Sequence, residues 1–185
     1  QLTLSPASYP NPGVKSRFME AVLERVRVSP GVRAAGMSTN IPLQLLSLDS
    51  TYVVEGRAVE NVAGVPITAH RLVTPGYLEA LGVSVVSGRL FTAHDPAETE
   101  PVVIVSERLA REAWPRDNPL GKRIRRLLPG NAPAPWLTVV GIVRDVKEDR
   151  FGFRIDRAVW YVPYAQQPPL SFEPPMNLIV QGGGG

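Results

Sequence analysis

Residues 76–95, GYLEALGVSVVSGRLFTAHD, restrict the possible folds more than any other part of the sequence. A short helix, a β-run and two glycine turns follow one another within this one stretch. Thr74 followed by proline predicts the N-cap and first position of the helix. Gly82 ends the helix, and the β-branched residues of 83–86 predict a strand. We therefore expect this part of the chain to form a strand, a helix and a strand of a mixed α/β fold.

The first third of the chain predicts a similar unit. Residues 2–4 alternate between apolar and polar side chains and indicate an opening strand. Asn11 and the proline after it predict the start of a helix, whose apolar face repeats every four residues at Val14, Phe18, Val22 and Val26. Pro30 and Gly31 end this helix, and residues 32–39 predict a returning strand.

The remaining elements follow from β-branched runs and from glycine and proline positions. We expect a hairpin of strands, a strand followed by a helix that Ser106 caps and Pro115 ends, and four later strands. Their residue ranges are 51–55 and 67–73 for the hairpin, 102–105 for the strand before the helix, and 122–127, 136–143, 159–162 and 178–180 for the later strands.

Composition excludes several classes of protein. The 185 residues are 44% hydrophobic, which suffices for a core, and the net charge is only +3. The chain has no cysteine, which excludes disulfides and thiolate metal sites. Basic residues are spread out apart from Lys122, Arg123, Arg125 and Arg126, so we expect no nucleic-acid partner. We interpret that cluster as a solvated face, and lipid headgroups or an acidic partner as its alternative ligands.

No constellation in the sequence predicts catalysis, a cofactor or a metal. His94 and Asp95 are neighbours whose side chains diverge in most conformations, so a metal site with Glu98 and Glu100 is not expected. Asp95 is interpreted as a turn cap and His70 as a half-exposed sheet residue. The chain has no G-x-S-x-G, no P-loop and no G-x-G-x-x-G, so we expect neither hydrolysis nor ATP binding.

Two apolar features need a partner or a core. Residues 41–50 are apolar but aperiodic, and we interpret them as an exposed loop whose Leu45, Leu46 and Leu48 form a possible partner contact. The tryptophans Trp114, Trp136 and Trp160 lie in apolar periodic surroundings, and we expect all three in the core.

Four blocks in order carry a resemblance to a known family. They are residues 76–95, then PVVIVSERLAREAWPRDNPLGKRIR at 101–125, WLTVVGIVRDVK at 136–147 and AVWYVPYAQ at 158–166. Together they resemble the extracytoplasmic core domain of MacB/FtsX-type ABC-transporter permeases. The resemblance extends over essentially the whole chain.

The resemblance implies an α+β fold with two lobes. A β-α-β porter-like lobe would take residues 1–95 and 158–181, a smaller α/β lobe would be inserted at 96–157, and 182–185 would be a glycine tail. The domain would lie between two transmembrane helices of its own chain, so the two terminal strands would belong to one lobe.

The resemblance also implies a function. It predicts a non-catalytic domain on the extracytoplasmic face of the bacterial inner membrane, which passes on helix motion driven by a separate cytoplasmic ATPase subunit. A periplasmic protein is a further possible partner. The alternative from a different class is a free-standing periplasmic binding module for a small molecule or peptide.

Overall fold

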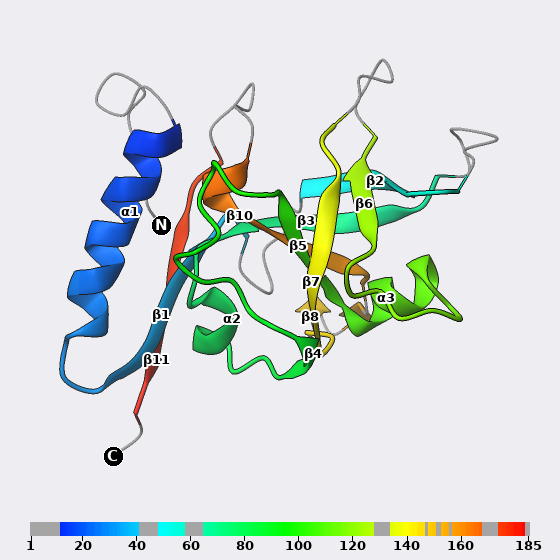
Figure 1. Ribbon diagram of the computed structural model, residues 1–185. Coiled ribbons are helices and arrows are strands. Elements are labelled where there is room, and N and C mark those ends of the chain that lie inside the picture. Colours follow the sequence, from blue (N-terminus) through cyan, green and yellow to red (C-terminus); the bar gives the residue numbers. More distant parts are fainter. Residues whose placement is uncertain are drawn as a thin grey trace.

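The computed structural model describes residues 12–40, 48–57, 65–127, 134–146, 148–150, 153–155, 157–167 and 174–183 (Figure 1). Three α-helices and one 3-10 helix lie in these ranges: α1 (Pro12–Arg27), α2 (Tyr77–Ala80), α3 (Glu107–Ala113) and η3 (Tyr164–Gln166). The strands are β1 (Val32–Ser38), β2 (Leu48–Val54), β3 (Ile67–Val73), β4 (Val85–Gly88), β5 (Val102–Ser106), β6 (Arg123–Arg126), β7 (Leu137–Val143), β8 (Glu148–Arg150), β9 (Phe153–Ile155), β10 (Val159–Pro163) and β11 (Asn177–Gly182).

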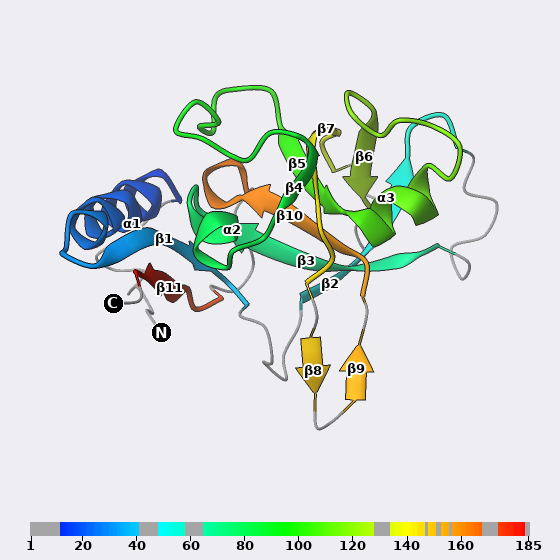
Figure 2. The same cartoon turned by 90° about the horizontal axis from the view of Figure 1, so that it is seen from below.

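Nine strands form one sheet, in which β10, β5, β7, β6, β2 and β3 follow one another. β3 also pairs in parallel with β10, from Ala69 with Val159 to Val73 with Pro163. The six strands therefore close into a ring, which leaves no free edge among them. Figure 2 shows the β8–β9 hairpin, a separate two-stranded sheet, projecting from this body.

The sheet continues beyond the ring through β1 and β11. β1 pairs with β3 only at Ser38 and Val73, and it pairs along its length with β11. Helix α1 covers this extension, where Met19 and Leu23 are buried against β1. Figures 1 and 2 show α1, β1 and β11 on one side of the molecule and α3 on the other.

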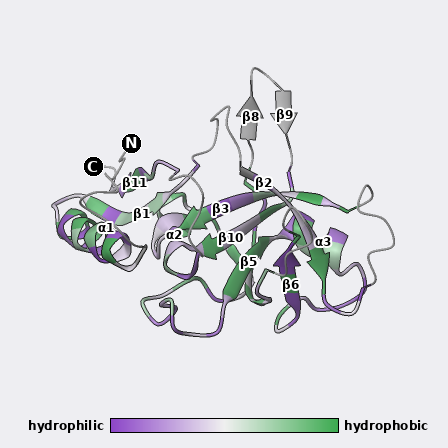
Figure 3. Cartoon of the chain, turned by 90° about the horizontal axis from the view of Figure 1, so that it is seen from above, coloured by the Kyte–Doolittle hydropathy of each residue, from purple (hydrophilic) through white to green (hydrophobic). Residues whose placement is uncertain are grey.

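Local signals explain the β5–α3 segment. The five residues of β5 are all buried, and the Ser106 side chain accepts a hydrogen bond from Leu109 N at 3.3 Å, which caps α3 as expected. The helix buries Leu109 and Ala113, and Trp114 after it is 5% exposed. Figure 3 shows the hydrophobic colour along β5 and β10 and the hydrophilic colour along β6, which is rich in arginine.

Several boundaries differ from the sequence predictions. Gly76, with φ +88°, is the N-cap of α2, whereas the Thr74 side chain accepts a hydrogen bond from Met37 N instead of capping the helix. The strand predicted at 83–86 begins at Val85 and pairs with β7, so β4 does not return beside β3. The predicted loop at 41–50 ends early, since Leu48 already begins β2 and its backbone pairs with His70.

The division into two lobes stays a prediction, and strands from both expected lobes share the sheet. β10 from the first expected lobe pairs with β5 from the second, and β2 pairs with β6. The predicted strand at 2–4 lies outside the described residues, so the expectation that the two terminal strands belong to one lobe is also untested. Within the described ranges, no helix is long and apolar enough to cross a membrane.

Candidate functional site

A cleft of about 210 Å³ lies beside helix α1, where the end of β3, the loop after β4 and the end of β10 come together. Arg17 and Glu20 border it from α1, and residues 73–75, at the end of β3, form its floor. The loop after β4 contributes Thr92, Ala93, Asp95 and Pro96, and Pro163 to Ala165 complete the wall at the end of β10. The cleft thus joins four segments that are distant in the sequence.

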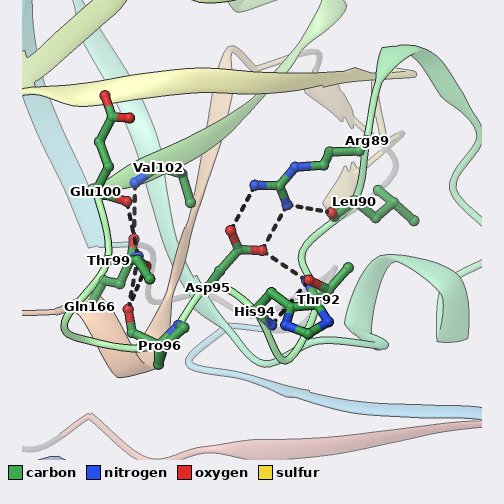
Figure 4. Close-up of polar contacts among 10 residues, drawn as sticks. All are labelled: Arg89, Leu90, Thr92, His94, Asp95, Pro96, Thr99, Glu100, Val102 and Gln166. Carbon is green, nitrogen blue, oxygen red and sulfur yellow. Dashed lines mark hydrogen bonds and ion pairs between the residues drawn. The ribbon is translucent and has the colours of Figure 1, made fainter.

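An ion pair holds the loop that borders the cleft (Figure 4). Arg89 donates to both carboxylate oxygens of Asp95, at 2.8 and 2.7 Å, and Thr92 N donates to the same carboxylate at 2.9 Å. The hydrogen bonds from Arg89 hold the pKa of Asp95 below its usual value, although burial acts in the opposite direction. Asp95 therefore closes a turn, as the sequence predicted, and it also anchors Arg89.

Replacing Asp95 by alanine should lower the free energy of unfolding by about 2 kcal/mol, because hydrogen bonds to an ionised group are lost and Thr92 N loses its acceptor. Urea unfolding at pH 7 measures the change. Glu98→Ala, which changes an exposed carboxylate of the same segment, is the matched control and should stay within about 0.5 kcal/mol of the wild type. Equal stabilities of the two variants would contradict the assigned role of Asp95.

Gln166 connects the same loop to the end of β10. Its side-chain oxygen accepts from Val102 N at 2.9 Å, and its amide nitrogen lies 3.1 Å from Pro96 O and 3.0 Å from Thr99 Oγ1. One side chain thus fixes the segment that leads into β5. The AVWYVPYAQ block contains this glutamine, but no pattern within the block could have predicted its partners.

Two polar groups of the cleft wall, both after strand β3, already have partners. Thr74 Oγ1 accepts from Met37 N at 2.8 Å, and Pro75 O accepts from Arg27 Nη2 at 2.6 Å. The surface left for contact is mainly apolar. This arrangement suits an apolar group rather than acid–base chemistry.

His70 is buried, and the expectation of a half-exposed residue is wrong. It is 5% exposed, its Nδ1 lies 3.2 Å from Ser50 Oγ, and its ring packs edge-on against Trp160 at a centroid distance of 5.5 Å. Burial, with a smaller contribution from the charge of Arg126, lowers the pKa of His70 to about 3. The sequence pattern did not predict this burial, because the closed sheet around His70 forms by the pairing of strands that are distant in the sequence.

The residues considered for a metal do not converge. His94 is exposed, and its backbone N–H donates to Thr92 Oγ1, while Glu100 accepts a hydrogen bond from Thr138 on β7. The described part of the chain holds no group of three or more His, Asp or Glu side chains that could bind a metal ion.

The basic cluster is largely paired on the outer face. Lys122 forms an ion pair with Asp117 at 2.6 Å, and Arg123 forms one with Glu55. Arg125 lies over the ring of Trp136, 4.4 Å from its centroid. Trp136 is therefore half-buried at the surface, and its expected place in the core is wrong, whereas Trp114 and Trp160 are buried.

The possible partner contact is only partly covered by the structure. Leu45 and Leu46 lie outside the described residues. Leu48 begins strand β2, as described above. The three leucines therefore stay a predicted contact.

The described strands and helices, together with the apolar cleft, make up a mixed α/β domain. Residues 3–181 match the profile of the MacB-like periplasmic core domain, and the chain belongs to this family. It is accordingly the periplasmic domain of a MacB-like ABC permease, with an extracytoplasmic location. No curated protein matches the chain.

Three solved structures share the fold. The periplasmic region of MacB from Actinobacillus actinomycetemcomitans has 16% identity and a TM-score of 0.57, with 89% of this chain and 64% of that chain covered. The extracellular domain of the ABC-type transporter YknZ from Gram-positive bacteria has 19% identity and a TM-score of 0.57, with 90% and 74% covered. A permease-protein domain from Porphyromonas gingivalis has 20% identity and a TM-score of 0.56, with 86% and 65% covered. The chain thus spans less than two thirds of the first and third structures.

Proposed function

We propose that this domain couples motion of the transmembrane helices of its own chain to work outside the cytoplasm, without catalysis of its own. A separate cytoplasmic ATPase subunit drives the motion, and the domain lies on the outer face of the inner membrane. Family membership supports this function over a free-standing binding module.

The observation that carries the proposal is a continuous hydrogen-bonded path across the domain. It begins at β11 and β1 and crosses to β3, where Thr39 N donates to Leu72 O at 3.0 Å and Thr74 N donates to Met37 O at 2.9 Å. From β3 it continues through β10 into β5 and β7. Displacement at one end can therefore be passed to the other end, since close-packed protein interiors have low compressibility and transmit strain.

Arg27 connects helix α1 to strand β1, at which the path begins. Its guanidinium donates to Ala35 O on β1 and to Pro75 O before α2, and it pairs with Glu20 on its own helix at 3.0 Å. Three elements thus meet at one side chain. The contact supports movement of α1, β1 and α2 as one body.

A partner protein outside the membrane is part of the same proposal. We propose Leu45, Leu46 and Leu48 as its contact, because three leucines lie within four residues of an aperiodic segment. Exposed apolar clusters are typical of interaction sites.

Coupling predicts that ATP changes the height of the domain above the membrane but not its internal distances. The full-length permease with its ATPase in nanodiscs would carry a luminescent donor at Arg116→Cys, on the exposed turn after α3, and acceptors on lipid headgroups. We expect transfer efficiency to change with ATP and to stay constant with a hydrolysis-deficient ATPase. A spin-label pair at Arg116→Cys and Val180→Cys should keep its distance. Constant transfer, or a changed internal distance, would contradict the proposal.

A further inference from the structure

The turn between α1 and β1 carries the most exposed large apolar residue of the described chain. Val28 is 83% exposed, whereas the next such side chain, Ile67, is 61% exposed. The turn is rigid, since Val28 N donates to Glu24 O and Ser29 N donates to Val26 O. A single exposed valine is ordinary on a protein surface, so only the residues around it can indicate a binding role.

Two cations lie close to this valine in the sequence. Arg25, in the last turn of α1, and Arg33, in β1, are both exposed, and neither takes part in an ion pair among the residues that the structure covers. Glu24 is the one exposed carboxylate of the turn, while Arg27 is held by Glu20. An apolar tip with arginines beside it matches the boundary between headgroups and acyl chains of an anionic bilayer.

The turn also lies beside the C-terminal end of β11. Gly183 N donates to Gly31 O at 2.7 Å, and Gly182 pairs with Val32 at the end of β11. Figure 1 shows the α1–β1 turn and the C-terminal end of β11 together at one end of the molecule. The carbons of the Arg33 side chain lie 3.7 Å from the position of a Cβ on Gly183.

We propose that the α1–β1 turn rests on the membrane surface, with Val28 at the level of the headgroups and with Arg25 and Arg33 on anionic lipid phosphates. This inference rests on the proposed insertion of the domain into a permease, in which the chain that leaves β11 enters the bilayer. The turn is then the part of the domain nearest the lipid. The coupling path would then meet the membrane at this turn as well as through the chain that follows β11.

Collision measurements on the full-length permease test the contact. A nitroxide at Val28→Cys, in a cysteine-free background and nanodiscs containing phosphatidylglycerol, should lose access to a water-soluble nickel chelate and gain access to oxygen. Ile67→Cys is the matched control, because Ile67 lies at the opposite end of β3 from the contact with β1 and should stay aqueous. Equal chelate access at the two labels would overturn the proposal.

The lipid charge separates an electrostatic contact from mere proximity. Arg25→Gln and Arg33→Gln should each lower the ratio of membrane-contacting to aqueous label about fivefold in phosphatidylglycerol discs. Neutral phosphatidylcholine discs should remove the effect of both substitutions. A ratio that either substitution leaves unchanged in phosphatidylglycerol discs would contradict lipid binding by that arginine. If the Val28 label is aqueous while ATP still changes the height of Arg116, the lipid contact fails and the coupling function stands.

Discussion

Gly36→Ala should lower the free energy of unfolding by about 3 kcal/mol or more, because helix α2 crosses β1 with no room for a side chain. A Cβ on Gly36 would overlap the backbone N and Cα of Tyr77 and lie 2.6 Å from the carbonyl carbon of Gly76. Backbone atoms cannot move aside as a flexible side chain can. The helix would have to separate from the strand, and the buried Tyr77 and Leu78 would lose their packing.

Gly182→Ala provides the matched control for this prediction. Gly182 lies in β11, the strand paired with β1, and the nearest atom to its added Cβ is Gly31 O at 3.8 Å. This variant should stay within about 0.5 kcal/mol of the wild type in urea unfolding. A Gly36 variant that unfolds at the wild-type urea concentration would show that α2 does not pack on β1 as described. Failure of the variant to fold at all, with Gly182→Ala intact, agrees with the prediction.

The Gly36 contact shows what a sequence pattern can reveal and what it leaves out. The four-residue spacing of apolar residues predicted α1, and Ser106 predicted the start of α3, because both signals act within one or two helical turns. Gly36 reads only as a glycine inside a strand. Its role depends on Tyr77, which approaches it through tertiary packing rather than through any local preference.

Closure of the sheet lies beyond local signals for the same reason. Residues 67–73 and 159–162 were correctly predicted as strands, but no local signal in either segment indicates that Ala69 pairs with Val159. The resemblance predicted the fold class and the family. The closed set of six strands explains why the expected half-exposure of His70 is wrong. An alternating pattern predicts one exposed face for a strand, whereas both faces of β3 are covered here.

The cleft was also absent from the sequence interpretation. Asp95 was correctly expected to close a turn, but Arg89 was not recognised as its partner, and Pro163 and Val73 meet only in the folded chain. Trp136 shows the opposite case, since its apolar neighbours suggested the core while Arg125 on the adjacent strand covers its ring. The residue type and its sequence neighbours suggest a buried or an exposed position, but the pairing of strands determines which of the two the residue occupies.

His70 should make the domain sensitive to acid well above the range in which carboxylates titrate. Its pKa is lowered from 6.5 to about 3 by burial, so the unfolded chain binds a proton between these values and the folded chain does not. The stabilising effect is complete above pH 6.5 and is lost progressively as the pH falls towards 3. With about 1.4 kcal/mol per pH unit, the loss reaches about 2.5 kcal/mol at pH 4.5.

Urea unfolding between pH 7.5 and 4.5 measures this slope. His70→Asn places an amide near Ser50 and removes the titrating ring, so its free energy of unfolding should vary less with pH than that of the wild type, whatever its absolute stability. His94→Asn, at the other histidine and on an exposed turn, removes an imidazole outside the core and is the matched control. If His70→Asn does not fold, the imidazole resonances of the wild type give the answer instead. A buried neutral ring predicts that the His70 shifts stay constant down to pH 4.5, and a titration near pH 6.5 would contradict its burial beside Trp160.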